Sequence, residues 1–256
     1  GTTVQAAKIR FALDSLIIEA AGDVILIRAN TTLRAPSVRY ELQKKVAQAS
    51  GGAILLESGT SLRADRMQFN LESQVTSAEG GVKLKQRDLT LTATWLRYDA
   101  RRKELSAGGG VRLDKEGSVL TAQDLIAKLD SRQAEAGGGA KLVVPPREWR
   151  DTGEDAASPV VTEETVIQAP RMIFRWDPDR AQAEGGVVIT QRGRTVTAES
   201  ASYEGETGEL VLEGQVVVEQ QVGQVEDGPP SSREDVQSGR SASSTATLTC
   251  KRLVLL

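Results

Sequence analysis

The chain has 256 residues, 39% of them hydrophobic and 4% aromatic, and its 32 basic and 35 acidic residues give a net charge of −3. Because it contains no histidine and a single cysteine, Cys250, it excludes a Ser-His-Asp triad, a histidine-rich zinc site and an internal disulfide. The charge balance gives no support for a nucleic-acid partner, and no apolar run approaches the roughly 18 residues that span a bilayer.

The most regular feature of the sequence is a glycine that returns at a fixed interval. Successive spacings are 29 residues, except for one of 47, which is the same period with 18 residues added. The positions are Gly22, Gly51, Gly80, Gly109, Gly138, Gly185 and Gly214. A period of this length indicates a repeat protein, in which each copy of one structural unit packs on its neighbours.

Two further landmarks keep the same step. A small residue recurs at Ala6, Ala35, Ala64, Ala93, Ala122, Ala169, Ala198 and Cys250. Five residues after each of these stand Phe11, Tyr40, Phe69, Tyr98, Ala127, Phe174, Tyr203 and Leu255. Every Phe and Tyr of the chain therefore falls at one position of the repeat, which indicates eight copies, the last one truncated.

Each copy predicts two β-strands. The first has the form apolar-x-Ala-x-x-apolar-x-aromatic, as in Leu62–Phe69. The second alternates between apolar and polar residues, as in the segment containing Ala78, Val82 and Leu84, which is typical of a strand with one buried face. Turn residues bound both strands and no helical stretch intervenes. We therefore expect an antiparallel all-β array of about 15 strands.

In the first strand of each copy the apolar step lengthens from two residues to three, for example between Ala64 and Met67. A slip at the same place in every copy predicts a bulge or a sharp bend. The alternative is that the alanine faces outward. We favour the bend, because the small residue recurs so regularly.

Two segments interrupt the repeat. One is rich in proline and acidic residues, and the other is rich in serine and glycine. The repeat resumes in register after each, so we expect one domain over residues 1–256, with surface insertions at about 145–164 and 223–244.

The repeated unit resembles that of the LptA/OstA-like lipopolysaccharide-transport proteins, written L-x-A-D-x-h-x-Y-D, a polar turn and A-x-G-x-V-x-h. This chain has LRADRMQFN followed by SAEGGVKL, LTATWLRYD followed by SAGGGVRL, and TVTAESASYE followed by LEGQVVV. The resemblance extends from Val4 to Leu255. The sequence departs from the family pattern in its doubled glycines, in Ala127 at the aromatic position and in the two insertions.

The resemblance implies an elongated antiparallel β-jellyroll, taco-like, with two facing sheets, built here from about eight 29-residue two-strand repeats. It implies a non-enzymatic periplasmic carrier that shields lipopolysaccharide acyl chains and forms part of the bridge to the outer membrane. The implied partners are lipopolysaccharide or a related glycolipid and other jellyroll proteins of the bridge, including further copies joined head to tail. No cofactor or metal is implied. For an exported protein we expect the leader to have been removed, because the sequence starts at Gly1 without a signal-peptide pattern.

An argument from the residues themselves leads to a similar expectation. A two-sheet fold must bury one face of each strand, and here that face is aliphatic with repeated Ala and Gly. Close packing explains any single small residue, whereas a whole row predicts an apolar trough, in which burial stabilises each lipid methylene by about 0.8 kcal/mol. The predicted lipid-binding residues are Leu62, Met67, Phe69, Val82, Leu84, Leu91, Leu96, Tyr98, Val111 and Leu113.

Two groups of side chains admit alternative interpretations. The six Phe and Tyr rings could form a core ladder of neighbouring aromatics or one wall of the lipid groove. We favour the ladder in the central copies. Basic residues from Arg63 to Lys103 gather in the third and fourth copies. They could contact lipid phosphates, but we favour a solvated face.

An open array of strands leaves two edges, near residues 4–11 and 247–255. The second reads ATLTCKRLVLL and carries few of the charges or prolines that usually prevent edge pairing. We therefore predict docking by strand addition; the alternative is that the chain is cut within the domain. The predicted docking residues are Val4, Ala6, Ile9, Phe11, Leu248, Cys250, Leu253 and Leu255.

Two other functions stay open. The chain could be the N-terminal periplasmic domain of the outer-membrane lipopolysaccharide assembly protein or an inner-membrane-anchored relative. It could also be a β-solenoid adhesin, with parallel strands and a dry core. An enzyme is disfavoured, because Asp177 and Asp179 flank a turn proline and the run Gly108–Gly110 precedes a strand rather than a phosphate-binding helix.

Overall fold

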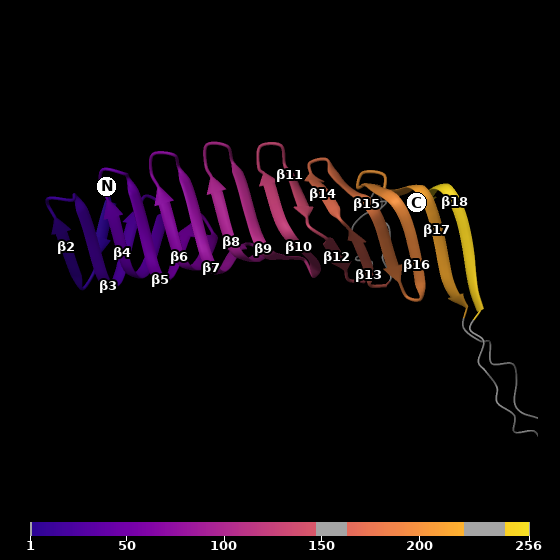
Figure 1. The fold of residues 1–256 in the computed structure, drawn as a ribbon, viewed down its shortest axis with the longest axis horizontal. Coiled ribbons are helices and arrows are strands. Elements are labelled where there is room, and N and C mark those ends of the chain that lie inside the picture. Colours follow the sequence, from indigo (N-terminus) through magenta and orange to yellow (C-terminus); the bar gives the residue numbers. More distant parts are fainter. Residues whose placement is uncertain (1, 147–162, 223–243, 256) are drawn as a thin grey trace, which may run out of the picture.

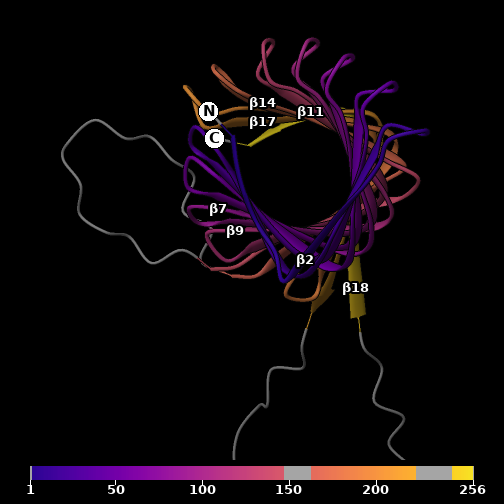
Figure 2. The ribbon, with the colours of Figure 1, turned by 90° about the vertical axis from the view of Figure 1, so that its left-hand side faces the viewer.

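The computed structural model describes residues 2–146, 163–222 and 244–255. Within these ranges the regular structure is β-strand throughout, and no helix could cross a membrane. The strands form one 18-stranded sheet that winds around a long axis (Figures 1 and 2). The two predicted insertions, 145–164 and 223–244, lie almost wholly outside the described residues.

Along the sheet the strands follow one another in chain order, except that where a strand is divided in two both parts pair with the same neighbouring strand. They are β1 (Thr2–Gln5), β2 (Lys8–Ala12), β3 (Ile17–Arg28), β4 (Thr31–Glu41), β5 (Val46–Glu57), β6 (Thr60–Asn70), β7 (Val75–Gln86), β8 (Leu89–Asp99), β9 (Glu104–Lys115), β10 (Ser118–Lys128), β11 (Gln133–Gly137), β12 (Ala140–Val144), β13 (Thr165–Ala169), β14 (Arg171–Trp176), β15 (Asp179–Gln191), β16 (Arg194–Glu204), β17 (Glu209–Val222) and β18 (Ser244–Leu255).

Every pairing between described strands is antiparallel. The all-β antiparallel prediction is confirmed, and the parallel β-solenoid alternative is wrong. Three of the expected full-length strands are each divided in two at the bend, as β1 and β2, β11 and β12, and β13 and β14. This division accounts for 18 strands where the sequence predicts about 15.

A bend crosses the whole sheet at the repeated glycines, where paired strands shift register. Between β5 and β6, for example, Ala53 pairs with Ala64 and Ser50 pairs with Arg66. Two glycines, Gly51 and Gly52, thus stand opposite the single residue Asp65, which is a β-bulge. The predicted bend is confirmed, but the extra residue belongs to the second strand of each copy rather than the first.

The bend divides the sheet into two walls. The long-turn wall comprises the strand halves that end in four-residue turns, such as Leu71–Gln74, together with the ends of β14 and β15 that meet at the two-residue turn Asp177–Pro178. The short-turn wall comprises the halves that end in two-residue turns, such as Ser58–Gly59. In Ser58–Gly59 both φ angles are positive, +46° and +83°, which suits the tight hairpins favoured by the twist of antiparallel strands. β12 and β13, and likewise β17 and β18, are adjacent strands whose short-turn ends flank the segments 145–164 and 223–244.

The hydrophobic core lies along the inner side of this bend. Ala49, Ala53, Ala78 and Ala107 are at most 1% exposed, and Val82 and Val111 pack in the same cluster. Small side chains are required because both walls converge there. The repeated alanine faces inward, since Ala64 is 2% exposed, so the alternative of an outward alanine is wrong.

Candidate lipid-binding site

The inner face of both walls carries apolar side chains in rows that run along the long axis. In the short-turn wall, Leu62 pairs with Leu84, Leu84 with Leu91, and Leu91 with Leu113. The same row continues in both directions through Leu26, Leu33, Leu55, Leu120, Leu142, Ile167 and Ile189. The inner face of this wall is therefore aliphatic from β3 to β15.

The structure brings all ten predicted trough residues into one hydrophobic cluster. Six of the ten are buried, with at most 5% of each residue exposed: Leu62, Met67, Val82, Leu91, Leu96 and Val111. The other four are half-buried: Phe69 and Tyr98 near the long turns, and Leu84 and Leu113 on the second strands of their copies. The first group packs as core, and the second group presents partly open apolar surface.

The aromatic rings do not form a ladder of neighbours. On the long-turn wall Phe69 pairs with Thr76, Thr76 with Tyr98, and Tyr98 with Leu105. Rings thus occupy every second strand, about 9.6 Å apart at a strand spacing of about 4.8 Å. A smaller or aliphatic residue lies between each pair of rings, so the row is one face of an apolar surface rather than an aromatic stack.

Part of this apolar inner face is not predicted from the sequence. Leu26, Leu55, Leu105 and Leu142 pack against the core although they were not predicted as site residues. The signal was available for Leu26, Leu55 and Leu142, because in every copy the inward valine or alanine that lies two residues after the repeated glycine is itself followed two residues later by an aliphatic residue.

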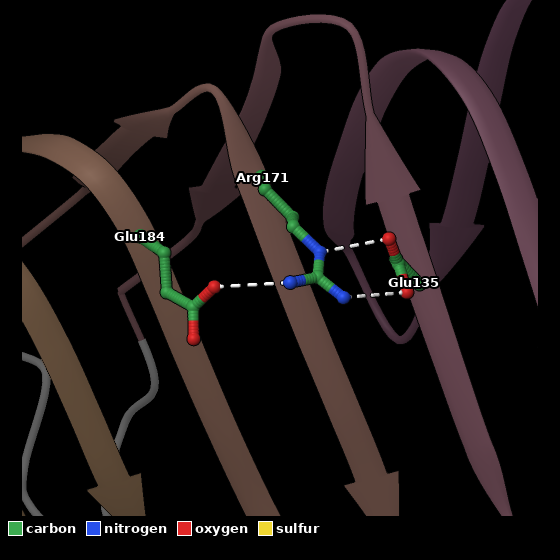
Figure 3. A network of polar contacts seen from close by, with 3 residues as sticks. All are labelled: Glu135, Arg171 and Glu184. Atoms are coloured by element: carbon green, nitrogen blue, oxygen red, sulfur yellow. Dashed lines mark hydrogen bonds and ion pairs between the residues drawn. The ribbon is translucent and has the colours of Figure 1, made fainter.

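The outer face of the long-turn wall carries a series of ion pairs. Arg171 of β14 donates two hydrogen bonds to Glu135 of β11, at 2.7 and 2.9 Å, and a third to Glu184 of β15 at 3.1 Å (Figure 3). These hydrogen bonds hold the pKa of the Glu135 carboxyl below its usual value. The same wall carries the ion pairs Arg39–Glu19 and Arg66–Glu79.

A polar recess of about 420 Å³ opens on the outer face of this wall. It is lined by Gln68, Asn70, Ser73, Val75, Ser77, Arg97, Asp99 and Arg102. Its lining is unsuited to acyl chains. Among the described residues no group of three or more His, Cys, Asp or Glu is placed to hold a metal ion.

The predicted docking residues lie at the two ends of the sheet: Val4 is in β1, Ala6 lies between β1 and β2, and the others are in β2 and β18, which Figure 1 shows at opposite ends of the molecule. Ile9 and Phe11 of β2 are 54% and 47% exposed, and Leu248 and Leu255 of β18 are 56% and 46% exposed. Val4 is also exposed, whereas Ala6, Cys250 and Leu253 are half-buried. β2 and β18 run in the same direction, because strands alternate and both correspond to the first strand of a repeat.

The fold and its apolar inner face define the class of protein: the chain is an elongated antiparallel β-jellyroll. The family model described as "LptA/(LptD N-terminal domain) LPS transport protein" matches residues 61–228. The chain therefore belongs to this lipopolysaccharide-transport family, as its repeat predicts.

A solved structure is also similar. LptH of Pseudomonas aeruginosa, described as the LptA homologous periplasmic component of the lipopolysaccharide transport device, shares 20% sequence identity with the chain. The match covers 42% of this chain and 82% of LptH, with a TM-score of 0.40. No curated protein sequence matches the chain.

Proposed function

We propose that the chain is a non-enzymatic periplasmic carrier, with residues 1–256 forming one jellyroll domain, which shields the acyl chains of lipopolysaccharide between its two walls. The observation that carries this proposal is the aliphatic row on the inner face of the short-turn wall, unbroken from β3 to β15. Membership in a lipopolysaccharide-transport family supports the identity of the lipid.

The half-buried side chains of this cluster supply the first contacts. Leu84 and Leu113 on one wall, and Phe69 and Tyr98 on the other, keep apolar surface that an acyl chain would cover. Ten buried methylenes contribute on the order of 8 kcal/mol, so several chains can be held without a specific polar contact. The fully buried residues at the bend would form the floor of the trough.

Recovery of bound lipid tests this proposal. Native mass spectrometry of the protein purified from a lipopolysaccharide-producing host should show a bound lipopolysaccharide species. The double variant Leu84→Asp/Leu113→Asp places two charges on the inner face and should abolish the bound species. The control Thr90→Asp/Thr92→Asp places the same charges on the opposite face of β8 and should retain it. Equal retention in both variants would exclude the inner face as the acyl site.

The exposed edges support a second part of the proposal, in which the carrier joins other jellyrolls of a bridge by strand addition at β1–β2 and at β18. β2 and β18 run in the same direction. A second copy that continued the same two walls beyond β18 would therefore pair its β2 in parallel with β18, and an antiparallel junction would need a partner with an oppositely directed edge.

The family description names two proteins, and this favours a second candidate within the same function. The chain would then be the N-terminal periplasmic domain of the outer-membrane lipopolysaccharide assembly protein, or an inner-membrane-anchored relative. Membrane fractionation of the native full-length protein separates these candidates, since only a free bridge component would be recovered without detergent.

A further inference from the structure

The two walls differ in how many of their charged side chains form ion pairs. The long-turn wall and its turns hold most of the ion pairs between described residues, and the basic partners include Arg39, Lys44, Arg66, Lys103 and Arg171. On the short-turn wall and its turns the described ion pairs are Arg112–Asp114 and Arg192–Glu163. Several basic side chains on the outer face of the short-turn wall therefore have no ion-pair partner among the described residues.

Three basic residues form the centre of this surface. Arg63 of β6 lies directly opposite Lys83 of β7, and Lys85 lies two residues further toward the short turn. All three are exposed, and none forms an ion pair with a described residue. We call Arg63, Lys83 and Lys85 the basic band. Like charges directly opposite one another on a sheet destabilise the pairing, so the folded protein bears a cost that a bound anion would relieve.

The basic band lies behind the apolar row. Arg63 follows Leu62, and Lys83 and Lys85 flank Leu84, so the charges and the trough residues share the same strands on opposite faces. Arg34 and Lys141 carry further positive charge along the long axis at the level of Arg63 and Lys83, whereas Arg112 at the same level is paired with Asp114. Lys85 stands two residues before the turn at Arg87, which lets its flexible four-carbon stem reach the rim of the wall.

We propose that the basic band holds the phosphate groups of a glycolipid headgroup whose acyl chains lie on the inner face of the same wall. This inference rests on the proposed function and deepens it by assigning the headgroup to one of the two rims. Phosphate is favoured because it is a dianionic acceptor that can bridge two neighbouring cations such as Arg63 and Lys83. Because the cations form a row parallel to the trough, a phosphate group would meet equivalent charges at successive positions as the lipid moves along the trough.

The test compares two charge variants that remove the same number of cations. Arg63→Gln/Lys83→Gln/Lys85→Gln removes the basic band. The control Arg39→Gln/Lys44→Gln/Arg66→Gln removes ion-paired cations from the long-turn wall. Thermal melting establishes that both variants are folded. Binding is measured at low salt for bisphosphorylated lipid A, for its dephosphorylated form and for the de-acylated bisphosphorylated disaccharide.

The band variant should weaken binding of bisphosphorylated lipid A by about tenfold or more, because each exposed charge contact contributes up to about fivefold. Its affinity for the dephosphorylated lipid should be unchanged, and the control variant should lose less than about threefold for either lipid. Equal losses in the two variants would overturn the assignment, as would an equal loss for the dephosphorylated lipid.

The de-acylated disaccharide separates this inference from the proposed function. It has no chains for the trough, so weak binding that the wild type shows and the band variant loses supports the headgroup site even if acyl capture fails. Conversely, acyl capture by the wild type without phosphate discrimination would leave the carrier function standing and reject the basic band. The wild type could instead bind phosphatidylglycerol vesicles as tightly as it binds lipid A. If the band variant then loses this vesicle binding as well, the basic band is assigned to a membrane surface.

Discussion

Gly80 lies directly against Asp65 at the bend, and a Cβ atom built on Gly80 would stand 2.9 Å from the Cβ of Asp65. The φ angle of Gly80 is +78°, a conformation that L side chains rarely adopt. The bend therefore depends on this glycine for both space and backbone conformation, and the same contact recurs between Gly109 and Thr94.

Gly80→Ala should lower the free energy of unfolding by about 1–3 kcal/mol, because the left-handed conformation costs an alanine about 1–2 kcal/mol and the new methyl group meets Asp65. Chemical denaturation measures the change. Gly81→Asn is the matched control: no atom lies within 4 Å of its Cβ position, and the equivalent position of the first repeat is Asp23, with a φ of +47°. A loss at Gly81 as large as that at Gly80 would contradict this account of the bend.

The Arg171–Glu135 contact predicts a pH-dependent contribution to stability. Hydrogen bonds from Arg171 lower the folded-state pKa of Glu135, so the contribution is present at pH values above the usual carboxyl value of 4.5 and is lost as the pH falls through the folded-state pKa. Glu135→Gln should cost up to about 1 kcal/mol at pH 7, since the pair is partly exposed. Denaturation curves at pH 7 and pH 3 should show the difference between variant and wild type shrinking on acidification. A difference that grows instead would reject the assignment.

Met67 should be the more sensitive of two apolar positions on β6 and β10. Met67 is 2% exposed and packs in the core, whereas Ile126 is 43% exposed and faces outward. Met67→Ala should lower the free energy of unfolding by about 2–5 kcal/mol, and Ile126→Ala by less than about 1 kcal/mol. Urea denaturation of the two variants checks the ranking, which the reverse order would disprove.

Deletion of residues 245–256 tests the predicted docking edge. If β18 is the contact, concentration-dependent self-association of the wild type, measured by light scattering, should disappear in the deleted protein. Circular dichroism must show that the remaining sheet persists, because the deletion also removes β18 from β17, which keeps only its pairing with β16. Unchanged association in a folded deletion variant would show that this edge is not the contact.

The sequence predicts the fold well because one 29-residue period carries the strand order, the turns and the inward face. The ten trough residues share one cluster for the same reason: Leu62, Val82 and Leu91 obey the alternation of a pleated strand. The origin of the bend could not be read from spacing alone, because the slip between Ala64 and Met67 does not reveal that the extra residue sits among the glycines of the neighbouring strand.

The sequence also could not predict which residues of neighbouring strands lie opposite one another. The aromatic positions Phe69 and Tyr98 are equivalent in the repeat, but only the register shows that Thr76 lies between them. The charge asymmetry has the same origin. The chain contains similar numbers of acidic and basic residues, so its composition does not reveal where the charges gather. That Arg63 lies opposite Lys83 follows only from which strands are neighbours in the sheet.

The most direct test of the carrier proposal compares neighbouring residues that face opposite sides of one wall. A photo-crosslinking amino acid at Phe69 or Tyr98 should capture the acyl chains of lipopolysaccharide. The same amino acid at Gln68 or Arg97, which line the outer recess, should not. Acyl adducts from the inner pair alone are the result predicted here. Adducts from the outer pair, or from neither pair under conditions in which lipopolysaccharide is bound, would contradict it.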